Sequence, residues 1–286
     1  MVNKYCVLIL SHGRPDRIYT YRTLRRHGYT GPIFIVIDDY DKTAEEYKRL
    51  YKKEVVVFNK QRYIDETDKA DNFGKTKTIV FARNAGFDIA ESLGYKQFIE
   101  LDDDYTSFVY KYNKTKCYEA RPIRNLDAIW DLIFNFYASH DILSTAMSQT
   151  GDHIGGKYSG FGLKGSRKAM NSFFLSTERR FKFIGTINED VNTYFLLGGQ
   201  GKIFLTIPIV ALQQKSTQQN QGGMTDVYLD HGTYLKTFYT VMLCPSSVKC
   251  SIMVTKNKRI HHRINWKATV PKIISDRFKK IAAQEK

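Results

Sequence analysis

Short apolar segments alternate with amphipathic or charged ones over residues 5–101 of this 286-residue chain, and that alternation limits the possible folds more than any other feature. Four segments rich in Val, Ile, Leu and Phe are predicted to be buried strands, namely residues 5–10, 33–37, 55–58 and 97–101. Three predicted helices lie between them, at residues 16–27, 45–53 and 78–93. Strands that alternate with helices predict an α/β fold, with a mostly parallel sheet and helices on both faces.

The remainder of the chain is less regular but still has the pattern of a folded domain. Its predicted helices are 126–137, 188–197 and 227–243, and its predicted strands are 142–148 and 202–212. The polar stretches 59–77 and 213–223 and the glycine-rich stretch 151–165 are predicted loops, and 256–286 is a basic tail. Because we find neither an internal repeat nor a long linker, we expect a single large domain with a basic C-terminal extension.

The composition excludes several classes of protein. With 42% hydrophobic and 26% charged residues, the chain is typical of soluble globular proteins and not of disordered ones. Its apolar runs are far too short to cross a bilayer and we recognise no signal peptide, so we expect a cytoplasmic protein without a membrane partner. The four cysteines lack zinc or redox spacing, which favours free thiols in a reducing compartment.

The positive charge of the chain is concentrated in its second half. Residues 1–150 contain 23 Lys and Arg against 21 Asp and Glu, whereas residues 151–286 contain 21 against 8. A one-sided excess of this kind indicates a surface that faces a polyanion, either nucleic acid or an anionic membrane. A solvated basic face without any partner is the alternative.

Polar side chains follow three of the four predicted strands, at the ends where parallel sheets bind their ligands. Ser11 and Arg14 follow the first strand, Asp38 and Asp39 follow the second, and an acidic triplet follows the fourth. Because these strand ends meet at one edge of the sheet, we expect a nucleotide site there.

The triplet Asp102–Asp104 is the sharpest signal in the sequence. Residues i and i+2 of an extended segment point the same way, so Asp102 and Asp104 are expected on one side and Asp103 on the other. Two carboxylates at a strand end suit a hard divalent cation, Mg²⁺ or Mn²⁺, which also binds diphosphate oxygens. A solvated acidic turn is the alternative.

Five motifs occur in a fixed order: a basic loop after the first strand, an acid after the second, ARNAG at 82–86, the DxD triplet and NED at 188–190. Over residues 4–215 this order resembles that of nucleotide-sugar glycosyltransferases of the GT-A fold. Within that fold, the sequences SHGRP, FIELDDD, INEDVNTYF, GGM and HHRINW are most similar to the phage TET-associated DNA glycosyltransferases and the base J glucosyltransferases.

The resemblance implies a metal-dependent enzyme that moves a sugar from a nucleotide sugar, above all a UDP-sugar, to a modified pyrimidine in DNA. The acceptor would be the hydroxymethyl group of 5-hydroxymethylcytosine or 5-hydroxymethyluracil, and the transfer would invert the anomeric centre. If the protein is phage-encoded, its location would be the host cytoplasm. The chain would divide into a nucleotide-sugar-binding half (1–125), an acceptor-binding half (126–235) and a basic C-terminal extension (236–286).

Roles for single residues follow from the same resemblance. The residues matched to the nucleotide sugar are Ser11, His12, Arg14, Asp38, Asp39, Arg83, Asn84, Asp102 and Asp103. The residues matched to the Mn²⁺ or Mg²⁺ cofactor are Asp102 and Asp104, with His262 as the preferred histidine. Asp190 would be the general base and Glu189 would position the acceptor, although acids in the first turn of a helix also stabilise the helix without any catalytic role.

The predicted DNA contacts lie in the basic second half. They are Lys157, Tyr158, Phe161, Lys164, Arg167, Lys168, His261 and Arg263. Aromatic side chains stack on bases and cations contact phosphates, while glycines allow close approach of the backbone. A flexible glycine-rich loop without a ligand is the alternative for residues 155–168.

Three other functions remain open from the sequence. The first is a GT-A transferase acting on a glycan or a lipid carrier, and the second is a non-catalytic DNA-binding protein whose acids are remnants. The third is a metal-dependent nuclease, which leaves the ARN and NED motifs without a role.

Overall fold

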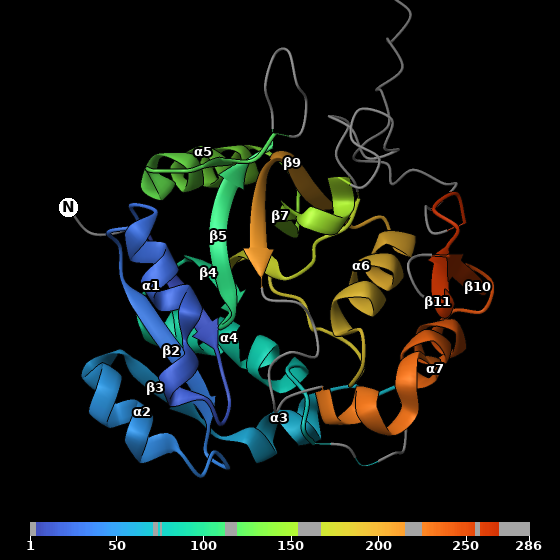
Figure 1. The fold of residues 1–286 in the computed structure, drawn as a ribbon, viewed down its shortest axis with the longest axis horizontal. Coiled ribbons are helices and arrows are strands. Elements are labelled where there is room, and N and C mark those ends of the chain that lie inside the picture. Colours follow the sequence, from blue (N-terminus) through green and yellow to red (C-terminus); the bar gives the residue numbers. More distant parts are fainter. Residues whose placement is uncertain are drawn as a thin grey trace, which may run out of the picture.

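A nine-stranded sheet organises the residues that the computed structural model describes, which are 4–70, 74, 76–111, 119–153, 167–214, 225–254 and 258–268 (Figure 1). In spatial order its strands are β3 (Val55–Phe58), β2 (Ile33–Asp38), β1 (Tyr5–Leu10), β4 (Gln97–Asp102), β8 (Ser172–Ser176), β7 (Ser144–Gln149), β9 (Phe204–Gln214), β5 (Tyr105–Tyr110) and β6 (Arg121–Pro122). Seven of these nine strands run in one direction, and only β5 and β8 run against them. The predicted α/β fold with a mostly parallel sheet is confirmed.

Helices cover both faces of this sheet, as the sequence predicts. They are α1 (Tyr19–Arg26), α2 (Ala44–Tyr51), α3 (Lys60–Glu66), α4 (Val80–Ser92), α5 (Leu126–Ser139), α6 (Glu189–Gly199) and α7 (Thr225–Leu243). Short 3₁₀ turns occupy Pro15–Arg17, Lys52–Glu54 and Thr150–His153. None of the helices in the described residues is both long and apolar enough to span a membrane.

The central strand β1 shows why the apolar runs in the sequence are unbroken. All six of its residues are buried, because successive side chains point to opposite faces and each face meets helices. Val7 and Ile9 pack in one core with Trp130 of α5, while Leu8 packs in the other core with Phe81 of α4. Two cores on a single sheet hold the loops at its carboxyl edge in place.

Among the elements that were not predicted from the sequence are the following three. Helix α3 lies in the segment expected to be a polar loop, where the Asn59 side chain accepts a hydrogen bond from the Arg62 amide at 2.9 Å and one helical face is buried. Strand β8 is inserted antiparallel between β4 and β7, in the middle of the sheet. A two-stranded antiparallel hairpin is formed by β10 (Val248–Val254), which precedes the predicted basic tail, and β11 (Lys258–Ile264), which lies within it, and tertiary contacts with α7 stabilise this hairpin.

Candidate active site

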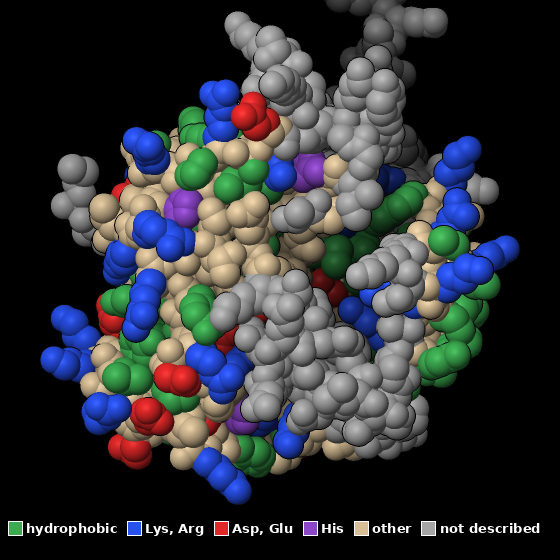
Figure 2. Space-filling view, in the orientation of Figure 1, with side chains coloured by type: hydrophobic (Ala, Val, Ile, Leu, Met, Phe, Trp, Pro, Cys, Tyr) green, Lys and Arg blue, Asp and Glu red, His purple; other side chains and the backbone are tan. Residues whose placement is uncertain are grey.

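A cleft of about 1150 Å³ lies at the carboxyl ends of β1, β2 and β4 and is bounded on its other side by α6, α7 and the β10–β11 hairpin. In Figure 2 it appears as a hollow with acidic and hydrophobic side chains in its depth. The predicted donor, metal and catalytic residues that line it are Ser11, His12, Arg14, Asp38, Arg83, Asp102, Asp103, Asp104, Glu189, Asp190 and His262. Residues from both halves of the chain therefore meet in one site.

The loop after β1 is tied to the middle acid of the triplet. Ser11 Oγ donates a hydrogen bond to Asp103 Oδ2 at 2.5 Å, and Arg14 Nη2 lies 3.1 Å from Asp103 Oδ1. Asp103 is only 2% exposed, and burial raises its pKa although Arg14 opposes this effect. Both carboxylate oxygens of Asp103 thus orient the β1 loop, so this residue shapes the donor side from within the protein.

Of the two acids after β2, Asp38 faces the cleft and Asp39 does not. His12 Nδ1 lies 2.8 Å from Asp38 Oδ2, and Lys60 Nζ lies 3.2 Å from the same oxygen. Burial raises the pKa of Asp38, but His12 and Lys60 outweigh burial and hold this pKa below its ordinary value. Asp39 is exposed, and its Oδ1 accepts a hydrogen bond from the Lys60 amide at 2.9 Å, so its place is at the start of α3.

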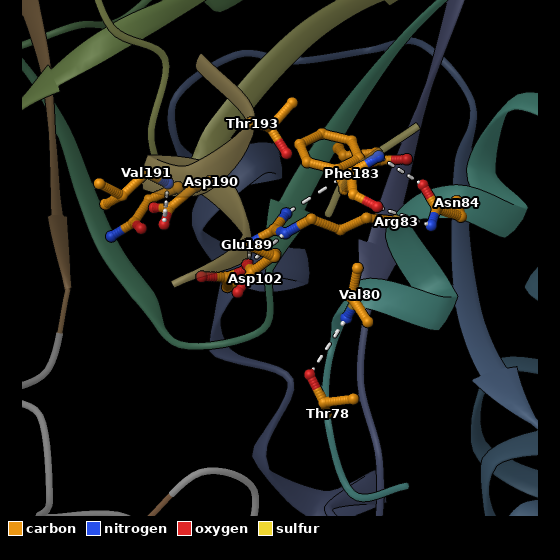
Figure 3. Close-up of polar contacts among 12 residues, drawn as sticks. Thr78, Val80, Arg83, Asn84, Asp102, Phe183, Glu189, Asp190, Val191 and Thr193 are labelled. Atoms are coloured by element: carbon orange, nitrogen blue, oxygen red, sulfur yellow. Dashed lines mark hydrogen bonds and ion pairs between the residues drawn. The ribbon is translucent and has the colours of Figure 1, made fainter. Parts of the chain in front are cut away.

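Arg83 of α4 connects the acids of β4 to the acids of α6 (Figure 3). Its guanidinium is 2% exposed, with Nε 2.9 Å from Glu189 Oε1 and Nη2 3.1 Å from Asp102 Oδ1. Burial alone would lower the pKa of Arg83, but the surrounding carboxylates raise it, so the group stays charged. The structure assigns this side chain to positioning two acids from opposite halves of the site.

A third carboxyl group lies beneath this ion pair. Glu100 of β4 is fully buried, and its Oε2 is 3.9 Å from Arg83 Nη1. Burial raises the pKa of Glu100 well above its usual range, although the Arg83 guanidinium opposes this effect. It occupies the space left by Gly86 on α4, where a Cβ atom would collide with Glu100 Oε1. The shortest contacts of Arg83 with carboxylates are those with Asp102 and Glu189.

The structure corrects the expectation for Asn84. Its side chain does not line the cleft, because adjacent helical residues point about 100° apart. Asn84 Nδ2 donates to the Phe183 carbonyl at 3.2 Å, and its Oδ1 accepts from the Phe183 amide at 2.8 Å (Figure 3). Asn84 thus anchors the segment before α6, whereas Arg83 and Ala82 line the cleft.

The acids of the NED motif lie in the first turn of α6. Asn188 precedes the helix in a left-handed conformation (φ 54°), and its Nδ2 donates to the carbonyl of Lys236 on α7 at 2.7 Å. Asp190 Oδ1 accepts a hydrogen bond from the Val191 amide at 2.7 Å. Burial and the neighbouring Glu189 raise the pKa of Asp190 to about 7, which suits a general base at neutral pH.

The acidic residues at the end of β4 fit a divalent cation. Asp102 and Asp104 are partly exposed and line the cleft. The pKa of Asp104 is raised to about 7, mainly by desolvation and to a smaller extent by the charges of Asp102 and Asp103. Such crowding of carboxylates is relieved by a cation. The described residues contain no cluster of three or more metal-ligating side chains, but Mg²⁺ commonly uses one or two carboxylates together with substrate phosphates.

His262 lines the same cleft from β11. It is 9% exposed, and its Nδ1 has no hydrogen-bond partner among the described residues. Burial, then His261 and Lys236, lowers the pKa of His262 to about 4, so the ring is neutral, which is the form that binds metals. Two aspartates and a neutral imidazole thus line the same cleft, although they do not form a three-ligand cluster in the described residues.

The predicted DNA contacts divide into three groups. Lys168, His261 and Arg263 line the cleft, and Lys168 Nζ pairs with Asp152. Arg167 is exposed and lies outside the cleft lining. The remaining four lie outside the described residues: Lys157, Tyr158, Phe161 and Lys164.

Sequence reasoning missed several residues of the cleft. Lys60 follows β3 at the carboxyl edge of the sheet, so the rule that singled out the other strand ends would have found it. Tyr194 and Trp266 also line the cleft, and their rings stack at 5.7 Å with an interplanar angle of 16°. No local sequence pattern predicts the contact between Tyr194 and Trp266, because the two residues meet only in the folded chain.

Comparison with known proteins supports the motif order. The sequence pattern of the family described as TET-Associated Glycosyltransferase matches residues 5–223. The comparison with curated proteins found no match.

Several solved structures are similar to the chain. Glucosyl-3-phosphoglycerate synthase from Mycobacterium tuberculosis, crystallised with Mn²⁺, UDP and phosphoglyceric acid, is 9% identical with a TM-score of 0.48, over 92% of this chain and 87% of that one. GalNAc-T7 with UDP, GalNAc and Mn²⁺ is 13% identical with a TM-score of 0.45, over 75% and 44%. S. aureus TarS with UDP-GlcNAc is 13% identical with a TM-score of 0.41, over 74% and 59%.

Proposed function

This chain belongs to the TET-associated glycosyltransferase family, and on that basis we propose that it transfers a sugar from a nucleotide sugar, preferably a UDP-sugar, to the hydroxymethyl group of a modified pyrimidine in DNA. The observation that carries the proposal is the meeting of the DxD and NED acids in one cleft. Asp102 and Glu189 are far apart in the sequence, yet the same guanidinium binds both. A donor-side acid and an acceptor-side acid are thus held at a fixed relative position.

On the donor side, Ser11, His12 and Arg14 follow β1 and Asp38 follows β2, where they would contact the nucleotide. Asp102 and Asp104 would hold a divalent cation, with His262 as a third ligand from the opposite wall. When bound, this cation supplies Lewis-acid neutralisation of the diphosphate leaving group. The domain division at residues 125 and 235 is part of the same proposal.

On the acceptor side, Asp190 would accept the proton of the acceptor hydroxyl. The acceptor oxygen forms a bond to the anomeric carbon, the bond from that carbon to the diphosphate oxygen breaks, and the nucleoside diphosphate leaves. Attack from the face opposite the leaving group inverts the anomeric centre. Glu189, fixed by Arg83, would orient the acceptor beside Asp190.

DNA as the acceptor is supported by the charge of the second half and by the family to which the chain belongs. A hydroxymethyl group at position 5 of a pyrimidine lies in the major groove, where a protein can approach it. Full entry of the base into the cleft would require that it be flipped out of the duplex.

A donor screen followed by an acceptor assay tests the proposal. Thermal shifts are measured with a panel of nucleotide sugars and Mn²⁺, and the best donor is incubated with hydroxymethylated DNA and with unmodified DNA of the same sequence. Nucleoside mass spectrometry is expected to show an added sugar mass only on the hydroxymethylated base. A donor that binds and is turned over on other acceptors, with no added mass on any DNA, would overturn the DNA acceptor and leave the glycosyltransferase assignment intact.

A further inference from the structure

The C-terminal elements α7, β10 and β11 form a unit at one side of the molecule, which we call the C-terminal wall (residues 234–254 and 258–268). In Figure 1 these elements lie beside α6, on the side opposite α1 and α2. Thr237 Oγ1 on α7 donates a hydrogen bond to the Ile260 carbonyl on β11 at 3.1 Å, which fixes the hairpin to the helix. The wall contributes Lys236, residues 251–253, residues 261–264 and Trp266 to the cleft.

This wall has an extreme charge composition. The chain contains no Asp or Glu between Asp230 and Asp276. Within the described part of the wall there are six lysines and arginines: Lys236, Lys249, Lys258, Arg259, Arg263 and Lys267. In Figure 2 lysine and arginine side chains gather over β10 and β11 beside the hollow.

Three of the four described cations of the hairpin lie on one face, and Lys258 lies on the other. Lys249 of β10 lies directly opposite Arg263 of β11, and Arg259 follows on the same face opposite Met253, because side chains two residues apart share a face. Like charges directly opposite each other destabilise an antiparallel pair. No acid in the described residues forms a salt bridge with Lys249, Arg259 or Arg263. An anionic ligand bound to this face would offset the repulsion.

The wall is held at a fixed position relative to the general base. Asn188, two residues before Asp190, donates to the Lys236 carbonyl at 2.7 Å and to Thr240 Oγ1 at 2.9 Å. Trp266, just after β11, stacks on Tyr194, one helical turn after Asp190 on α6. A ligand bound to the hairpin face is therefore placed against the catalytic helix.

The C-terminal wall also lies outside the part of the chain that matches the family, which ends at residue 223. The matched part contains the donor and catalytic acids, while the wall supplies the opposite side of the cleft.

We propose that the β10–β11 hairpin is a duplex-binding element that contacts DNA phosphates without reading sequence, through Lys249, Arg259 and Arg263, and so presents the target base to the cleft. The inference rests on the proposed DNA acceptor. It goes beyond that proposal by naming the element that binds the duplex and the sequence-independent character of the contact.

The test compares the double variant Lys249→Gln/Arg259→Gln with a matched control, Lys48→Gln/Arg49→Gln on α2, which lies on the opposite side of the molecule in Figure 1. Binding to short hydroxymethylated duplexes of two unrelated sequences is measured by fluorescence anisotropy across a range of salt concentrations. We expect the hairpin variant to bind both duplexes about ten- to fiftyfold more weakly at about 0.1 M salt, with a salt slope smaller by about two. The control should match the wild type, and UDP with Mn²⁺ should raise the melting temperature of all three proteins equally.

The outcomes separate this inference from the proposed function. If the wild type glycosylates DNA but the hairpin variant binds both duplexes with wild-type affinity and salt slope, the hairpin is not the duplex-binding element. If only one of the two sequences is affected, the contact reads bases and the sequence-independent assignment is wrong. If the wild type neither binds nor modifies any duplex but binds vesicles containing phosphatidylglycerol, DNA is not the acceptor, and the inference about the hairpin is wrong as well.

Discussion

The two sides of the cleft differ in the charged residues that they carry. The donor side, at the ends of β1, β2 and β4, gathers buried acids held by a few buried cations, such as Asp103 with Arg14 and Asp38 with Lys60. The C-terminal wall opposite it has no acids and presents exposed cations such as Arg259. The charged groups of the donor side form ion pairs with one another, whereas those of the C-terminal wall face outward.

The difference indicates what each side is for. Buried charges that are paired and hydrogen-bonded keep a fixed geometry, which suits a site that must place a cation and a leaving group. Exposed cations on a two-stranded hairpin have little effect on the stability of the fold. They attract a polyanion over a distance that the ionic strength of the solution determines. The donor side thus resembles a chemical site, and the C-terminal wall resembles a docking surface.

Replacement of the proposed general base should have the largest effect. Asp190→Asn should lower the rate of sugar transfer about 10²- to 10⁴-fold, because it removes the proton acceptor, while the KM for the donor stays close to that of the wild type. The exposed residue Asp65 provides the control Asp65→Asn, which should keep full activity. Transfer by Asp190→Asn at the wild-type rate would mean that the acid only stabilises the start of α6.

Breaking the link between the two sets of acids should cost the most stability. Arg83→Met leaves the partly exposed Asp102 and the buried Glu189 without their cation, and urea unfolding should show a loss of about 3–5 kcal/mol. The matched control is Arg180→Met, since Arg180 also pairs with two acids, Asp88 and Glu91, but at the surface. That control should lose less than about 1 kcal/mol. Equal losses in both variants would contradict the role of Arg83 as a buried connector.

Removal of the aromatic contact between the C-terminal wall and α6 should have a smaller effect. Trp266→Ala loses its stack on Tyr194, which is worth about 1 kcal/mol, and should raise the KM for the acceptor without changing the KM for the donor. Trp266→Phe keeps an aromatic ring and should restore most of the acceptor affinity. A change in donor KM alone would assign Trp266 to the donor side.

The dependence of stability on pH should come from the acidic site. The pKa values of Asp104 and Asp190 are about 7 in the folded protein, against 3.8 for an ordinary aspartate, so the folded protein binds these protons more tightly than the unfolded chain. The stabilisation is present below about pH 4 and is lost as the pH rises through about 7. The melting temperature should therefore be lower at about pH 8 than at about pH 5.5, and UDP with Mn²⁺ should narrow that difference. A melting temperature that rises over this interval would contradict the assignment.

Much of the fold was predictable because the first half follows simple rules. The strands β1 and β3 begin and end where the apolar runs do, and Ser11, Asp38 and the acidic triplet are at the expected edge. Strand β8 was not predictable in this way, because its partner strands β4 and β7 come from distant parts of the sequence. The hairpin was missed for a related reason, since the basic composition of β11 is that of a tail and its packing against α7 is not visible in the sequence.

The candidate site shows the same division. The motif order was enough to bring Asp102, Asp104 and Asp190 forward as candidates, and all three line the cleft. It did not distinguish Asp38 from Asp39 or Arg83 from Asn84, because neighbouring residues differ in direction, and direction depends on the backbone around them. Their hydrogen bonds settle the placement: Asn84 is bound to Phe183, and Asp39 to the start of α3.

The amino-acid sequence by itself determined the class of fold, the edge of the sheet that carries polar residues and the uneven distribution of charge. These are properties of short segments and of composition, which periodicity and counting can detect. Only the tertiary structure decided that Arg83 joins Asp102 to Glu189 and that the C-terminal wall faces the acids across the cleft. Such pairings depend on the packing of elements that are far apart in the chain. Local sequence patterns do not predict which of these distant side chains come into contact when the elements are buried.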